Sequence, residues 1–206
     1  MLKETFTLLM RRYTGDMTMI DRRWREIELA YSAPKRHYHT LAHLNNLITE
    51  LEVYKEEIDK WDTVMLSVFY HDIIYNTLQQ DNEELSAQLA VDRMTELHFP
   101  AVVIADCKEQ ILATKSHELS ENNDTNLFTD ADLAILGKDP ETYRTYAAQI
   151  RKEYRLYPDI VYKPGRKKVL EHFLSMHRIY KTDLFAHRYE QQARRNIEQE
   201  LNTPIP

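Results

Sequence analysis

Apolar residues recur along this chain at the three- and four-residue spacing of amphipathic helices. A first stripe, closed by Pro34, consists of Ile20, Trp24, Ile27 and Tyr31. A second and longer stripe contains Leu41, Leu44, Leu47, Ile48, Leu51, Tyr54 and Ile58. A short polar break at Asp59-Lys60 precedes a third segment, from Asp62 through the nearly apolar run Val64–Tyr70. These patterns predict three helices, and the third is apolar on nearly all sides, as buried helices are.

Polar residues and prolines mark the boundaries of further helices. Asp81, followed three residues later by Glu84, has the pattern of a capping box and predicts a helix that reaches Leu97. A second helix is expected over Val102–Thr114, followed by a polar loop over Ser116–Asn126. Thr129 is expected to cap a short helix, Asp130–Leu136, that ends at Gly137.

The last third of the chain also predicts helices. Asp139-Pro140 places proline at a first helical position, and Pro164 is expected to open the next helix. A final helix is predicted from about Asp183 to Leu201. With only 3 glycines and no repeat or linker, the sequence predicts an all-α fold in a single domain over residues 1–206.

Composition and charge exclude several classes of protein. The net charge of -6 argues against a binder of nucleic-acid polymers, which needs a basic face. Cys107 is the only cysteine, so no internal disulfide can form, and a reducing, cytoplasmic location is expected. The first residues carry charges of both signs, unlike a signal peptide, and no run approaches the ~20 apolar residues of a membrane span.

Four residues on predicted helices indicate chemistry: His43, the adjacent pair His71-Asp72, and Asp132. The pair ends the apolar run from Val64, where an imidazole and a carboxylate are costly to bury unless something compensates them. A divalent metal would compensate both. The helices carrying His43 and His71 are joined by a short break, so we expect them to run antiparallel and to bring the two imidazoles toward one ion.

The order of these residues resembles the HD superfamily of metal-dependent phosphohydrolases. Further segments are similar to a subgroup of predicted HD phosphohydrolases, and together they span most of the chain: Tyr38–His43, His71–Tyr75, Asn82–Ala87, Thr114–His117, Asp130–Gly137, Gly165–Leu170 and Ala193–Asn196. The resemblance implies a single HD-domain helical bundle. It also implies an enzyme that cleaves a phosphate ester or anhydride of a small molecule, with a nucleotide as the expected substrate.

The resemblance further implies that His43, His71, Asp72 and Asp132 ligate one divalent ion. Asp130 competes with Asp132 for the last position; its alternative role is to stabilise the N-terminus of its own helix. Two imidazoles with two carboxylates suit Mn²⁺, Fe²⁺, Co²⁺, Ni²⁺ or Zn²⁺ better than Mg²⁺, which prefers oxygen ligands.

A hydrolase also needs a proton acceptor. Glu83 is the candidate proton acceptor, and Asp72 is the other predicted catalytic residue. The alternative role of Glu83 is structural, because a carboxylate in the first turn of a helix interacts favourably with the helix dipole. Glu84 is expected to serve the capping box instead.

The substrate phosphate needs cationic or polar partners. Arg36, Lys115 and Arg166 are the candidate phosphate contacts, and His39 and His117 are candidate substrate contacts. Each of the three basic residues has a common alternative as a solvated surface charge.

Two other functions remain open. The ligands could serve a sensor of metal or nucleotide without turnover, or a di-iron oxygenase of the HD type, for which His117 is the only additional support. The sequence also departs from HD branches with known substrates, since Tyr75 stands three residues after Asp72, where the nucleotidase branch has a glutamate.

Overall fold

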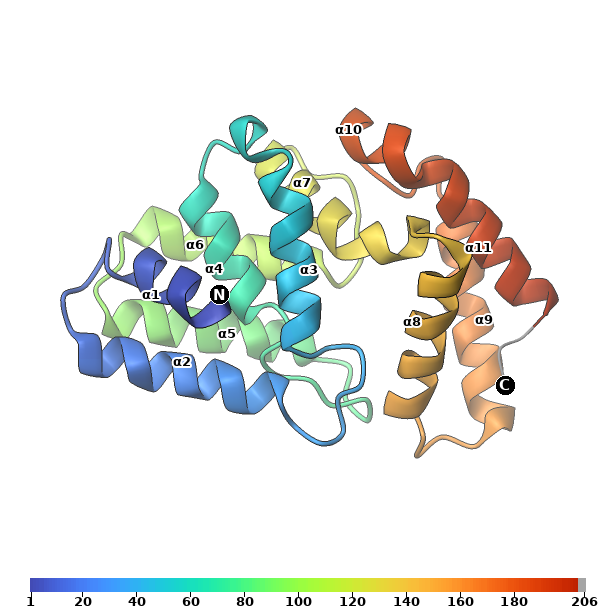
Figure 1. The fold of residues 1–206 in the computed structure, drawn as a ribbon, viewed down its shortest axis with the longest axis horizontal. Coiled ribbons are helices and arrows are strands. Elements are labelled where there is room, and N and C mark those ends of the chain that lie inside the picture. Colours follow the sequence, from blue (N-terminus) through green and yellow to red (C-terminus); the bar gives the residue numbers. More distant parts are fainter. Residues whose placement is uncertain (204–206) are drawn as a thin grey trace. The chain divides into compact units, whose positions relative to one another are not determined.

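A computed structural model describes residues 1–203 of the chain, and all of its regular structure over those residues is helical (Figure 1). The all-α prediction is thereby confirmed. The chain divides into two compact units, Met1–Thr129 and a second that begins at Asp130. The boundary lies within one continuous helix, α7 (Asn123–Leu133). That the chain is a single HD-type domain stays a prediction.

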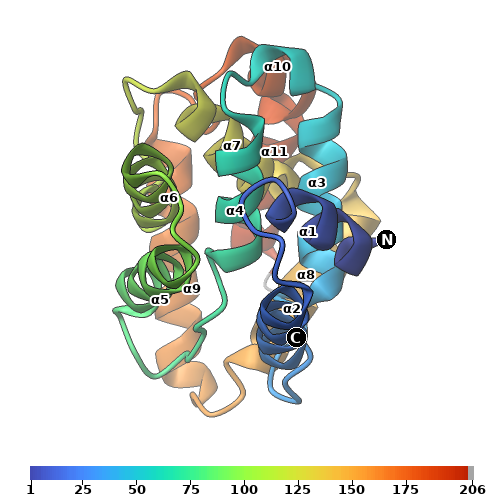
Figure 2. The same ribbon diagram turned by 90° about the vertical axis from the view of Figure 1, so that its left-hand side faces the viewer.

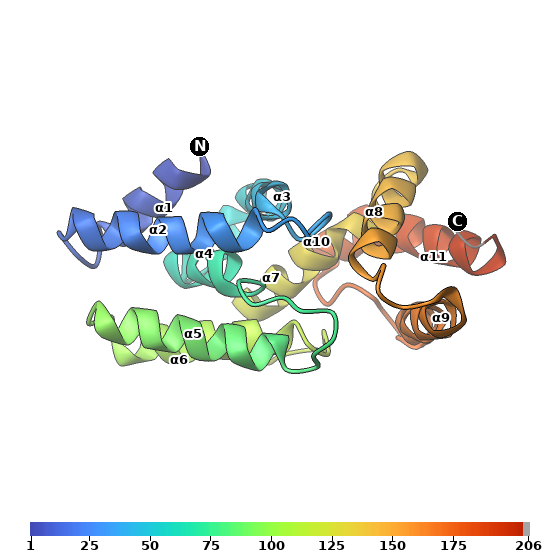
Figure 3. The ribbon, with the colours of Figure 1, turned by 90° about the horizontal axis from the view of Figure 1, so that it is seen from below.

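The first unit surrounds a buried central helix, α4 (Trp61–Tyr70), in which every residue from Thr63 to Tyr70 is buried. The helices in contact with it are α1 (Leu2–Met10), α3 (Leu41–Glu52), α5 (Asn82–Glu96) and α6 (Ala101–Ala113). α5 and α6 pack side by side, as Figures 2 and 3 show. α2 (Met17–Tyr31) packs on α1, and a 3₁₀ turn, Lys55–Glu57, lies between α3 and α4.

The second unit contains the last turn of α7, a 3₁₀ turn at Ala134–Gly137, α8 (Pro140–Glu153) and α9 (Asp159–Ser175). It ends with α10 (Asp183–Phe185), a π-helical turn at Ala186–Glu190 and α11 (Gln191–Asn202), which together form the helix predicted from Asp183. Position 137 requires glycine, because the Cβ of any other residue would lie 2.5 Å from the Cβ of Tyr189.

Several predicted boundaries are confirmed. α5 begins one residue after Asp81, and α6 lies within one residue of the predicted range. α8 begins at Pro140, and the Asp139 side chain accepts hydrogen bonds from the N–H groups of Glu141 and Thr142. Proline at the first helical position is as predicted, and the capping carboxylate of Asp139 acts together with it.

The predicted start of α7 was wrong. The helix begins at Asn123, so the predicted polar loop ends earlier than Asn126 and Thr129 is not a cap. Thr129 is fully buried, and its hydroxyl donates to the carbonyls of Thr125 and Asn126 within the helix. The capping side chain is that of Asn122, which accepts from the Asp124 N–H at 2.9 Å. Asparagine and aspartate indicate loops and helix starts equally well, which explains the error.

Three other boundaries also differ from prediction. Pro164 lies inside α9, which begins at Asp159. The long apolar stripe is interrupted after Glu52, so α3 is shorter than the pattern suggested. Asp81 makes no side-chain capping bond, and Glu84 pairs with Lys115 instead of closing a capping box. Over residues 1–203 no helix is both long and apolar enough to cross a membrane.

Candidate metal centre

Two histidines from neighbouring helices meet in the interior of the first unit. His43 lies in the first turn of α3, and His71 is the residue that ends α4. Their side chains are only 2% and 1% exposed, and their Nε2 atoms are 3.1 Å apart. The predicted convergence of these imidazoles is therefore present in the structure.

The protonation of the His71 ring follows from its second nitrogen. Nδ1 lies 2.9 Å from the carbonyl oxygen of Val68, one turn earlier in α4. A carbonyl can only accept, so Nδ1 carries a proton, and when the ring is neutral its lone pair is at Nε2. Metal-binding histidines are oriented in this way by backbone carbonyls.

Asp72 adds a carboxylate to the same point. Its Oδ2 lies 3.1 Å from His71 Nε2 and 3.7 Å from His43 Nε2. Ligand atoms bound at ~2.1 Å and at right angles are about 3 Å apart, and at tetrahedral angles about 3.4 Å apart. The two separations of 3.1 Å fit neighbouring ligands of one ion, and the separation of 3.7 Å corresponds to a wider angle of about 120°. Burial alone would raise the pKa of Asp72, but the positive charge of the adjacent histidines in their protonated form, His71 foremost, holds it below its ordinary value.

Asp132 is carried by α7, the unbroken helix that starts in the first unit. His43, His71 and Asp132 each offer one ligand atom, and these atoms all lie within 4.8 Å of one another. This group could hold a metal ion. Its two histidines are buried and its aspartate is half-buried, so donors with little access to water face a common point.

Asp130, the competing candidate, has other partners. Its side chain is fully buried, and its Oδ1 accepts from the Lys181 N–H while its Oδ2 accepts from the N–H and hydroxyl of Thr182, each at 2.8 Å. Thr182 is the N-cap of α10. Asp130 thus binds the start of α10 and does not stabilise the start of its own helix, which lies seven residues earlier.

The segment that follows Asp72 is anchored to α5. The Ser86 hydroxyl accepts from the Ile74 N–H at 3.1 Å and lies 3.2 Å from the Ile74 carbonyl. The Asn82 side chain bonds both the N–H and the carbonyl of Asn76. These contacts give the Asn82–Ala87 motif a function in the fold, because they fix the loop beside Asp72.

Glu83 lies between these anchors, in the first turn of α5, and is half-buried. Burial raises its pKa above the ordinary value, and the negative charge of Asp72 raises it further. Glu83 therefore senses the charge of Asp72, and its position in the first turn of α5 follows the loop that the Ser86 and Asn82 contacts fix.

Aromatic side chains line the site, which the sequence pattern did not predict. The Tyr31 hydroxyl accepts from the Asp72 N–H at 3.1 Å. His39 lies with Nε2 3.9 Å from Asp72 Oδ2 and with its ring centre 4.3 Å from that of Tyr75. The ring of Tyr38 is 5.0 Å from that of His43. His39 is therefore at the edge of the ligand group, as a substrate contact would be.

Arg36 has a different role from the predicted phosphate contact. It is buried, and its guanidinium donates to the carbonyls of His39, Asp72 and Ile73 at 3.2, 2.6 and 2.8 Å. It also lies over the ring of Tyr31. Its donors bind the backbone on both sides of the ligand group, so it supports the site rather than facing a substrate.

Lys115 and His117 lie just past the C-terminal end of α6. The Lys115 ammonium donates to the Gln80 carbonyl at 2.8 Å and pairs with Glu84, next to Glu83, on the exposed surface. His117 adopts φ 51°, and its N–H donates to the Ala113 carbonyl, which ends the helix. Within residues 1–203, His117 is not part of the ligand group formed by the two histidines and Asp132.

Arg166 belongs to the second unit, where it also has a structural partner. Its Nε and Nη2 bond the two carboxylate oxygens of Glu200 at 2.9 and 3.0 Å, and the Tyr143 hydroxyl donates to the same carboxylate at 2.5 Å. The pair lines a cavity of about 300 Å³. A planar two-bond pairing of this kind holds α9 to α11.

Comparison with known proteins leaves the family undecided. No family model, curated protein or solved structure matches this chain. The resemblance to the HD superfamily thus stays a prediction, and the function has to be argued from the site itself.

Proposed function

We propose that this protein is a metal-dependent phosphohydrolase of the HD type that cleaves a phosphate ester or anhydride of a small molecule, with a nucleotide as the substrate class. One observation carries the proposal. His71 Nε2, a lone-pair atom because Nδ1 bonds a carbonyl, lies 3.1 Å from both His43 Nε2 and the Asp72 carboxylate. A lone pair that faces a carboxylate in a buried place is repelled unless a cation lies between them.

A doubly protonated His71 is the other arrangement that satisfies these distances. It would form an ion pair with Asp72. A metal ion uses all four groups at once. The ion would be Mn²⁺, Fe²⁺, Co²⁺, Ni²⁺ or Zn²⁺ rather than Mg²⁺, because half of the ligands are nitrogen atoms.

Each residue then has a defined task. His43, His71, Asp72 and Asp132 would hold the ion, which when bound supplies a water of lowered pKa and polarises a phosphoryl oxygen. Glu83 accepts the proton of the attacking water, for which its raised pKa is suited. Arg36, through its bonds to the carbonyls on both sides, keeps Asp72 and His39 in place.

The substrate phosphate needs a cationic side chain that can release its present partner in the protein and bind the phosphate instead. Lys115 qualifies, because its ion pair with Glu84 is at the surface, where such pairs contribute little. His39, beside Asp72, is the second candidate. Arg36 and Arg166 are omitted from this role because their donors bind buried carbonyls and a buried carboxylate.

The test is metal analysis of the purified protein followed by phosphate release across a panel of nucleotides and sugar phosphates. We expect about one transition-metal ion per chain and release that depends on it, both absent in His71→Ala. Lys60→Ala, which removes a surface ion pair with Asp106, is the matched control and keeps both. A metal-free wild type that binds none of the five ions on addition would sink the proposal. Stoichiometric metal without release from any substrate would instead favour a sensor.

A further inference from the structure

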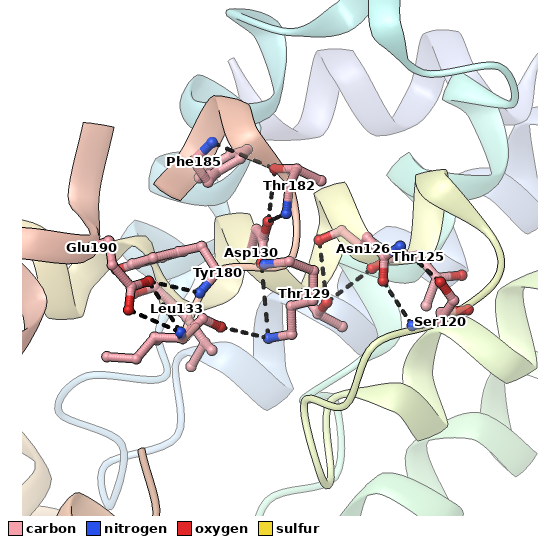
Figure 4. Close-up of polar contacts among 12 residues, drawn as sticks. Ser120, Thr125, Asn126, Thr129, Asp130, Leu133, Tyr180, Thr182, Phe185 and Glu190 are labelled. Carbon is pink, nitrogen blue, oxygen red and sulfur yellow. Dashed lines mark hydrogen bonds and ion pairs between the residues drawn. The ribbon is translucent and has the colours of Figure 1, made fainter. Parts of the chain in front are cut away.

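Three consecutive residues of the second unit contact the last turn of α7, the turn that carries Asp132 (Figure 4). Lys181 and Thr182 bind the Asp130 carboxylate through their N–H groups, each at 2.8 Å. Tyr180 donates its hydroxyl proton to the Leu133 carbonyl at 2.9 Å. We call Tyr180–Thr182 the α7 clamp. It contacts the helix on both sides of Asp132 in the sequence.

The Tyr180 contact is at a point where the helix changes its geometry. α7 ends at Leu133, and the chain continues as a 3₁₀ turn from Ala134. The bonding pattern changes at such a junction, and helix ends fray readily. Tyr180 is fully buried, so its hydroxyl bond is shielded from water and fixes the carbonyl that directly follows Asp132.

The clamp also neutralises Asp130. The side chain of Lys181 is only 4% exposed, and its ammonium lies 3.8 Å from Asp130 Oδ1. With this charge and three hydrogen bonds, Asp130 is satisfied inside the second unit. It therefore does not compete with Asp132 for a cation, although only one residue separates them.

The clamp is itself held in place. The Glu190 carboxylate accepts from the N–H groups of Ile179 and Tyr180, at 3.0 and 3.2 Å, and from Arg194 Nε at 2.7 Å. Glu190 ends the π-helical turn, and such turns are frequent at functional sites. A carboxylate bonded on three sides gives the clamp a fixed position relative to α11.

We infer that the α7 clamp positions Asp132 for metal binding, with Tyr180 as the positioning residue that fixes the end of α7. The inference rests on the proposed function only in that Asp132 is taken as a ligand. The residues of the α7 clamp would thus affect metal affinity through Asp132, without contacting the metal themselves. Partners that orient metal ligands typically contribute about 10- to 100-fold in affinity.

The experiment compares Tyr180→Phe with wild type by Co²⁺ titration, followed through the visible absorption of the bound ion. We expect Tyr180→Phe to bind Co²⁺ about 10-fold more weakly. The control is Tyr189→Phe, which removes another hydroxyl bond of the same unit, from Lys138 at 3.0 Å, that does not reach α7. A merely structural role predicts equal Co²⁺ affinity in the two folded variants, whatever their melting temperatures, and would overturn the inference.

Thr182 provides a second and independent comparison should Tyr180→Phe not fold. Thr182→Val removes the hydroxyl bond to Asp130, and Thr182→Ser retains it. We expect weaker Co²⁺ binding and a changed Co²⁺ spectrum in the valine variant, with recovery in the serine variant. Equal affinities in both would contradict the positioning role. A wild type that binds no Co²⁺ would contradict the proposed function itself, so the two failures are distinguishable.

Discussion

Single residues decide whether this centre binds metal, and Asp130 and Asp132 give the sharpest comparison. Asp132→Asn should weaken metal binding by more than about 100-fold, beyond the effect of an orienting partner, because it removes a ligand charge. Asp130→Asn should weaken it by no more than about 10-fold. It should instead cost about 1–3 kcal/mol of stability, since an amide nitrogen would face a backbone donor.

Isothermal titration with Mn²⁺ and urea denaturation of the metal-free proteins would measure both effects. The reverse order, with Asp130→Asn the weaker metal binder, would mean that the ligand assignment on α7 is displaced by two residues.

Glu83 and Glu84 separate chemistry from structure. Glu83→Gln should keep the metal and lower turnover by about 10²–10⁴-fold, because a general base is lost. Glu84→Gln should leave the rate at saturating substrate nearly unchanged, because Glu84 pairs with Lys115, a proposed phosphate contact, and so affects substrate binding rather than the proton transfer. Single-turnover phosphate release at saturating metal would measure the difference. If Glu83→Gln turned over at a rate near that of wild type, the metal and Asp72 would activate the water without Glu83.

The pKa of Glu83 also predicts a pH profile. Burial, and then the charge of Asp72, raise this pKa above 4.5, and only the ionised carboxylate can accept a proton. Turnover at saturating metal should fall as the pH falls through the pKa of Glu83, which a bound cation lowers from its metal-free value, and Glu83→Gln should lack this step. Metal occupancy has to be measured at each pH, because protons also compete for the histidine ligands.

At the residue scale, the sequence predicted that His43, His71 and Asp132 come together, but it did not show which partners the basic residues have. His71-Asp72 stood out because an imidazole and a carboxylate ended an apolar helix, and burial makes that combination costly. Arg36 and Arg166 looked like phosphate contacts because nothing in a sequence shows whether a guanidinium already has partners. Those partners, the carbonyl of Ile73 and the carboxylate of Glu200, come from segments over 30 residues away.

At the scale of elements, helices whose starts are marked by a proline or a polar boundary residue were predicted well. Asp139-Pro140 marked the start of α8, because a proline acts within one turn. Asp81 marked the start of α5 by its position, although its side chain makes no capping bond. The start of α7 was missed because its polar first turn resembles a loop. There Asp124 is 3% exposed, and its carboxylate accepts from the N–H groups of Asp59 and Lys60, a contact no local pattern reveals.

That contact predicts that Asp124 links α7 to the turn before α4. Asp124→Ala should lower the free energy of unfolding by about 2 kcal/mol, because two backbone donors lose a charged acceptor in a buried place. Urea denaturation would measure the loss. Asp106→Ala, which removes the side-chain partner of the same Lys60, is the matched control and should cost much less. Equal losses would show that the backbone bonds contribute nothing beyond a surface ion pair.

At the scale of the whole molecule, the ligands are far apart in sequence, at positions 43, 71, 72 and 132. An unfolded chain cannot hold these groups together, so a metal that binds them binds the folded state alone. Ligand binding of this kind stabilises the fold by RT ln(1 + [L]/Kd), or about 2.7 kcal/mol at a hundredfold excess over Kd. The melting temperature therefore reports on the whole ligand set at once.

We expect wild-type protein to melt at a lower temperature after chelation and to regain its melting temperature when Mn²⁺ or Co²⁺ is restored. His71→Ala should have the same melting temperature with and without metal, because it lacks the proposed ligand that lies closest to both His43 and Asp72. Scanning calorimetry at several metal concentrations would show the rise in melting temperature with the logarithm of concentration that linkage requires. If His71→Ala responded to metal as wild type does, the stabilising ion would be bound elsewhere, and the two buried histidines would be partners of one another rather than ligands.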